Sequence, residues 1–148
     1  MLPQILLFFA SKEEEILRQN LIIWHAICKT DNFNDVYLNQ LKLPENIFDA
    51  YLHRIAEEFE RAFKEEEWSL FINCCASITA FTGAFPKYLI NFKPLIPTLI
   101  KITANKTELL RKNAAVLIAR LSNNEECLKC IRANHGTDVL LSLKDVLT

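Results

Sequence analysis

The feature that most constrains this chain is a Leu-x-x-Asn spacing that stands at the start of three long apolar stretches. The copies are Leu17/Asn20, Leu70/Asn73 and Leu110/Asn113. The first and last asparagines lie 93 residues apart, which corresponds to two units of about 46 residues. Self-similarity at such a period is typical of stacked helical units. We therefore interpret the whole sequence as a helical repeat, and not as a chain built around one local motif.

The repeat divides one domain, residues 1–148, into units 1–43, 44–93 and 94–136 and a partial fourth unit 137–148. Proline and acidic residues at helix starts, with turn residues after helix ends, set the expected helix limits. The first unit is predicted to hold helices 3–10, 15–29 and 34–41. The second is predicted to hold helix 46–64, a helix opened by the acids 65–67 and ended near Gly83, and helix 87–92. The remaining predicted helices are 94–104, 108–122, 125–134 and 137–147.

Composition favours helices throughout. Hydrophobic residues make up 51% of the chain, and there are only two glycines, so phosphate-cradling loops are not expected. In helix 46–64, Ile47, Tyr51, Ile55, Phe59 and Phe63 recur every four residues, which predicts one broad buried face. The adjoining acids Glu65–Glu67 are interpreted as helix-start residues, and a metal or basic-partner site there ranks lower.

The net charge of −1 conceals an acidic N-terminal half and a basic C-terminal half. A solvated helical surface is the preferred interpretation, and contact with nucleic acid or an acidic partner is the alternative. The five cysteines fall in apolar helical patterns, which predicts reduced, buried thiols and a cytoplasmic and/or nuclear location. The apolar run 5–10 is short and has no basic flank, so it is interpreted as a core helix and no membrane contact is predicted.

Signals for chemistry are weak. Cys127-x-x-Cys130 followed by His135 has some similarity to a zinc site, but two ligands on one helix need two more, and apolar packing is preferred. His25 and His53 have no adjacent nucleophile or carboxylate arrangement. No phosphate-binding loop, nucleophile elbow or His-Glu-x-x-His motif is present in the sequence. We therefore predict no catalytic residues, no metal and no cofactor.

The third unit carries a family resemblance. Residues 111–122 (RKNAAVLIARLS), then 124–127 (NEEC) and 131–136 (IRANHG), resemble the armadillo repeat. The resemblance extends over residues 94–148, is weaker over 1–43, and covers 44–93 only in the order of helices. It implies an all-α fold, a right-handed α-solenoid of three-helix repeats whose long third helices line a concave groove. It also implies a non-enzymatic scaffold that binds another protein.

Helical spacing places a candidate groove on one stripe of each long helix. The stripe residues are Asn20, Ile23 and Ile27, then Asn73, Ala76 and Ala80, and finally Asn113, Val116 and Arg120. In relatives that import proteins into the nucleus, the resemblance places a peptide-clamping asparagine at the last position of each triplet. Ile27, Ala80 and Arg120 stand there instead, so that function is not expected. The stripe asparagines Asn20, Asn73 and Asn113 are expected either to present amides to a peptide or to bond neighbouring loop backbone.

The preferred partner is therefore a peptide or helical segment of another protein. The alternative in a different class is nucleic acid or an anionic surface bound by the basic C-terminal half. A third interpretation is a structural segment of a longer solenoid, or self-association through open solenoid ends. The basic residues of the alternative are Lys93, Lys101, Lys106, Arg111, Lys112, Arg120, Lys129 and Arg132.

Overall fold

A computed structural model of the chain describes residues 45–104, 107–139 and 141. Within these residues the chain is 86% helical and contains no strand, so the predicted all-α class is confirmed. The predicted helices of the first unit lie outside the described residues, as do the stripe positions Asn20, Ile23 and Ile27.

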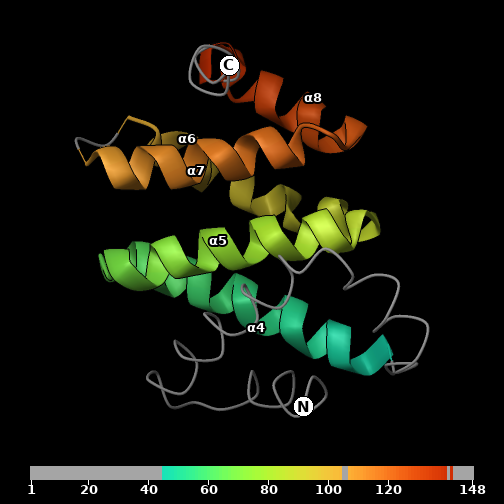
Figure 1. The fold of residues 1–148 in the computed structure, drawn as a ribbon. Coiled ribbons are helices and arrows are strands. Elements are labelled where there is room, and N and C mark those ends of the chain that lie inside the picture. Colours follow the sequence, from blue (N-terminus) through green and yellow to red (C-terminus); the bar gives the residue numbers. More distant parts are fainter. Residues whose placement is uncertain (1–44, 105–106, 140, 142–148) are drawn as a thin grey trace. The chain divides into compact units, whose positions relative to one another are not determined.

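The chain divides into two compact units, Met1–Ala84 and Phe85–Thr148. In the described part of the first unit, α4 (Glu45–Lys64) is followed by α5 (Trp68–Ala84). The second contains the 3-10 helix η2 (Pro86–Leu95), then α6 (Ile96–Ile102), α7 (Glu108–Leu121) and α8 (Glu125–Ala133). Figure 1 shows the order of these helices along the chain. The break at Ala84 falls inside the predicted repeat unit 44–93, and the repeat boundaries themselves stay a prediction.

An aromatic core joins α4 to α5. Tyr51, Ile55 and Phe59 of α4 are fully buried, as their four-residue spacing predicts. The Tyr51 ring lies 4.5 Å from that of Phe81, and the Phe59 ring lies 4.7 Å from that of Phe71, between ring centroids. Such short offset contacts add to the stabilisation that burial of the rings provides. Phe63, expected on the same buried face, is only half-buried.

One polar pair lies inside this core. The hydroxyl oxygens of Tyr51 and Ser77 are 2.9 Å apart, and both residues are fully buried. Each hydroxyl therefore has a hydrogen-bond partner where water is excluded, which offsets the cost of burying it. Phe48, buried beside Phe81 at a centroid distance of 6.1 Å, also belongs to this core, although the predicted set names its neighbour Ile47.

The turn between α4 and α5 differs from its prediction. Glu66 has a φ of 58°, and the Glu67 N–H donates to the Ala62 carbonyl over 2.9 Å. This is the Schellman arrangement that ends a helix, with glutamate where glycine is usual. The acids 65–67 precede α5, and none lies in its first turn. Their predicted role as first-turn residues of that helix is therefore wrong.

The second compact unit (unit 2, Phe85–Thr148) begins with the 3-10 helix η2, where an α-helix over 87–92 is predicted. Pro86 stands at its start, and Pro94, which has no backbone N–H, lies inside it. The following helix α6 is correspondingly shorter than the predicted 94–104. By contrast, α7 ends one residue before its predicted limit of 122, and α8 ends one residue before 134. Residues 137–139 and 141 are again helical, at the start of the predicted last helix.

The core of unit 2 is built from one face of each helix. In α7, Leu110, Ala114, Leu117, Ile118 and Leu121 are buried, at the spacing of an amphipathic helix. They pack with η2 and α6, whose buried residues are Leu89, Phe92, Leu95, Ile96, Leu99 and Ile102. The other residues of α7 are half-buried or exposed.

The end of α8 repeats the turn found after α4. His135 has a φ of 61°, and the Gly136 N–H donates to the Ile131 carbonyl over 2.8 Å. The left-handed residue is therefore His135, and not Gly136, which was expected to supply the turn. Gly136 is needed for a different reason. A Cβ on this glycine would lie 2.8 Å from Ile131 Cγ2 and 3.0 Å from Ile100 Cδ1.

Candidate binding surface

The predicted stripe of α5 is partly accessible along its whole length. Asn73, Ala76 and Ala80 are each half-buried. Leu70, the leucine of the repeated spacing, is fully buried, as are the other core residues of the helix, Phe71, Cys74, Ser77, Ile78 and Phe81. The helix therefore presents its stripe to one side and its core residues to another. The side chains at two of the three stripe positions, Ala76 and Ala80, are small.

The predicted stripe of α7 is more exposed. Asn113 and Val116 are half-buried, and Arg120 is exposed. The stripe begins one turn earlier than predicted, because Leu109 has 56% of its surface accessible and lies four residues before Asn113. This exposed leucine was missed by sequence reasoning, although its spacing from Asn113 and Val116 was available as a signal. A large apolar side chain left in water beside a polar stripe is typical of a contact surface.

The side-chain amide of Asn113 bonds within its own helix. It donates to the Leu109 carbonyl over 2.8 Å. This partner differs from the neighbouring loop backbone that was one interpretation, and presentation of the amide to a peptide stays a prediction. One amide N–H is thus used within α7, and the amide is fixed close to the exposed Leu109.

The α7 stripe contains one exposed cation, Arg120, and has a second, Lys112, beside it. Lys112 and Arg120 are both exposed, and neither has an ion-pair partner within the part of the chain that the structure describes. By contrast, Lys93 lies 3.8 Å from Glu126, and Lys129 lies 3.2 Å from the same carboxylate. The charge of α7 is therefore available to a partner, whereas that of η2 and α8 is partly balanced locally.

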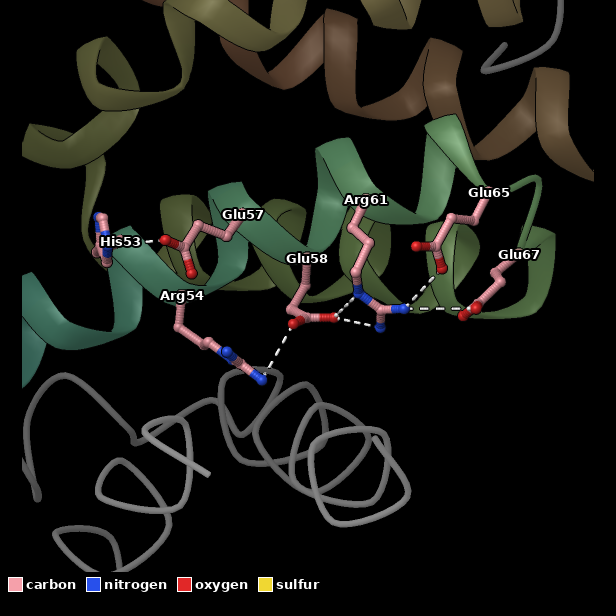
Figure 2. Close-up of polar contacts among 7 residues, drawn as sticks. All are labelled: His53, Arg54, Glu57, Glu58, Arg61, Glu65 and Glu67. Carbon is pink, nitrogen blue, oxygen red and sulfur yellow. Dashed lines mark hydrogen bonds and ion pairs between the residues drawn. The ribbon is translucent and has the colours of Figure 1, made fainter. Parts of the chain in front are cut away.

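A second polar cluster, on α4, was not predicted. Glu58 has only 6% of its side chain accessible and is held between Arg54 and Arg61. Its two oxygens lie 3.0 Å from Arg54 Nη2 and 2.6 Å from Arg61 Nη2, and Figure 2 shows these groups along one side of the helix. The spacings of four and three residues are those of neighbours on a helix and were the available signal.

Arg61 also connects α4 to the turn that follows. Its Nη1 lies 3.0 Å from Glu65 and 3.4 Å from Glu67 (Figure 2). The hydrogen bond to Glu58, with the neighbouring carboxylates, raises the pKa of the Arg61 guanidinium. Glu65 and Glu67 thus pair with Arg61 at the end of α4, and the cluster braces the helix terminus.

The four described cysteines are free thiols. Cys74, Cys75 and Cys127 are buried, as predicted, and burial raises the pKa of each thiol. Cys127 donates to the Leu89 carbonyl over 3.5 Å. Cys130 is only half-buried, and its sulfur accepts a bond from the Asn134 amide over 3.6 Å.

The histidines give no sign of a catalytic or metal site. His53 is exposed and lies 2.9 Å from Glu57, its neighbour one turn along α4. His135 is exposed beside α8, and His25 lies outside the described residues. Over residues 45–104, 107–139 and 141, no three His, Cys, Asp or Glu side chains are grouped as a metal would require.

No helix in the described ranges has both the length and the apolar character needed to cross a bilayer. The chain matches no protein-family model, and no curated protein matches it.

Proposed function

We propose that this chain is a non-enzymatic, armadillo-like module, a right-handed solenoid that binds a segment of another protein along the stripes of its long helices. One observation carries the proposal. At all six described stripe positions the side chain is half-buried or exposed, while the leucines that open the two described copies, Leu70 and Leu110, are buried. If these stripes served only internal packing, we would expect their side chains to be fully buried in both compact units.

Two further observations support this function. The helix order of residues 94–136 follows the plan that the armadillo resemblance implies, with the long helix α7 followed by the short helix α8. Three of the four described cysteines are buried thiols, which fits the proposed cytoplasmic or nuclear location. The stripes lack the peptide-clamping asparagines that the resemblance places in nuclear-import relatives. This supports a partner other than a nuclear-import signal.

The test is capture of a partner followed by surface substitution. Arg120→Glu and Ala80→Arg change one stripe each, and we expect both to weaken the captured complex because they alter charge or close approach. Arg132→Glu is the matched control, because Arg132 is also an exposed arginine in the last turn of its helix. A complex that survives both stripe substitutions, or that is lost equally in the control, would contradict the proposal.

Nucleic acid is the second candidate, and a specific observation favours keeping it. Five cations of unit 2 are exposed without an ion-pair partner in the described residues, namely Lys87, Lys101, Lys112, Arg120 and Arg132. Binding of a generic oligonucleotide whose affinity falls steeply with salt, and which Lys101→Glu weakens as much as Arg120→Glu, would favour this function.

A further inference from the structure

The exposed face of α7 has a regular order of charge and apolar surface. Lys112, Val116 and Arg120 follow one another at intervals of four residues, and the two cations are exposed. Residues four apart lie on the same side of a helix, separated by about 6 Å along its axis. Leu109, 56% exposed, precedes Lys112 by about 4.5 Å along the same axis.

These four positions span about 16.5 Å of the helix axis, and four same-side residues of an extended peptide span about 20 Å. The long, flexible side chains of Lys112 and Arg120 can cover this difference. Alternate residues of an extended strand point to the same side and are about 6.6 Å apart. A strand lying along α7 therefore meets Leu109, Lys112, Val116 and Arg120 with four successive same-side residues. The first and third meet apolar side chains, and the second and fourth meet cations without an ion-pair partner in the described part of the chain.

We propose that the α7 stripe binds an extended, acidic segment of another protein with the pattern apolar-x-acidic-x-apolar-x-acidic. The acidic residues meet Lys112 and Arg120, and the apolar residues cover Leu109 and Val116. Glu108, exposed at the start of α7, repels a carboxylate at that end and so favours the apolar residue there. The inference rests on the proposed function and specifies the chemistry of the partner.

The experiment uses the full chain and a fluorescent synthetic peptide, Leu-Ser-Glu-Ser-Leu-Ser-Glu, followed by fluorescence anisotropy. A second peptide of the same composition has its two glutamates adjacent, and a third has glutamine at both positions. We expect the first peptide to bind about tenfold more tightly than either control, since both ion pairs need the correct spacing. Equal binding of the first two peptides would overturn the proposal.

Protein variants locate the binding site. Arg120→Glu and Leu109→Ser are expected to weaken binding of the first peptide about tenfold, whereas Arg132→Glu leaves it unchanged. Circular dichroism of each variant establishes that the fold is intact. Loss of binding in Arg132→Glu equal to that in Arg120→Glu overturns the proposal, as does tighter binding of polyuridylate at the same stripe.

The proposed function and the proposed peptide pattern can fail independently, and the experiments distinguish the two failures. If the captured partner still depends on Arg120 while no patterned peptide binds, the specific chemistry is wrong and the proposed function stands. If the peptide binds α7 but the captured complex ignores every stripe substitution, the peptide site is real and the proposed partner surface is wrong.

Discussion

At the residue scale, His135 and Gly136 divide two tasks that one glycine often performs. His135 adopts the left-handed backbone at a φ of 61°, and Gly136 admits the side chains of Ile131 and Ile100. We predict that His135→Gly stabilises the protein by roughly 0.5–1 kcal/mol, because relief of the left-handed strain exceeds the added entropy of the unfolded chain. Gly136→Ala is expected to destabilise it by roughly 1–3 kcal/mol, because the new Cβ overpacks the turn. Urea unfolding measures both, and an alanine at 136 that is neutral would refute the account.

Also at the residue scale, the described thiols differ in how accessible they are to a reagent. Burial raises the pKa of Cys74, Cys75 and Cys127, so less thiolate is present at pH 8 and these side chains are also shielded from reagent. Among the four described cysteines, we predict that iodoacetamide at about pH 8 alkylates half-buried Cys130 first, and the other three only after unfolding. Peptide mapping by mass spectrometry gives the order. Concentrated urea is the control in which all four react alike, and rapid labelling of native Cys74 would contradict the prediction.

At the scale of the element, the α4 terminus depends on the cluster around Glu58. Glu58→Gln keeps the size of the side chain but removes the charge between Arg54 and Arg61, whose side chains are 18% and 33% accessible. Because both arginines are partly hydrated, we predict a loss of roughly 1–3 kcal/mol, less than for a fully buried pair. The control is Glu57→Gln, where the carboxylate is exposed and pairs only with His53; its expected effect is within about 0.5 kcal/mol. Similar losses in the two variants would show that the cluster has no special role.

The helices also show how much of the structure the sequence could predict. The limits of α4, α7 and α8 came within one residue of the predicted ones, because apolar periodicity and end residues act locally. The 3-10 form of η2 was not predicted, since it depends on how Pro86 and Pro94 fit the packing of unit 2. The acids 65–67 were assigned to the wrong helix, because Arg61 is reached only once the α4–α5 turn has folded.

The accessibility of the candidate surface was predicted to a similar degree, and its role in binding stays a prediction. Helical spacing placed Asn73, Ala76 and Ala80 on one accessible stripe of α5, and the same rule held for α7. The exposure of Leu109 was missed, although its spacing from Asn113 and Val116 distinguishes it from Leu110 beside it, which is buried. The sequence likewise did not reveal that the Asn113 amide bonds its own helix.

At the scale of the whole molecule, the proposed solenoid requires each unit to stabilise its neighbour. Both tryptophans, Trp24 and Trp68, belong to the first unit, whereas the fully buried Leu117 belongs to the second. Leu117→Ala removes core volume and is predicted to cost about 2–5 kcal/mol. In a solenoid, this loss in the second unit lowers the melting temperature reported by tryptophan fluorescence together with that reported by circular dichroism. The exposed control Leu109→Ala is expected to shift neither. A fluorescence transition that Leu117→Ala leaves in place would mean that the units unfold independently, and the continuous core of the proposed solenoid would then be wrong.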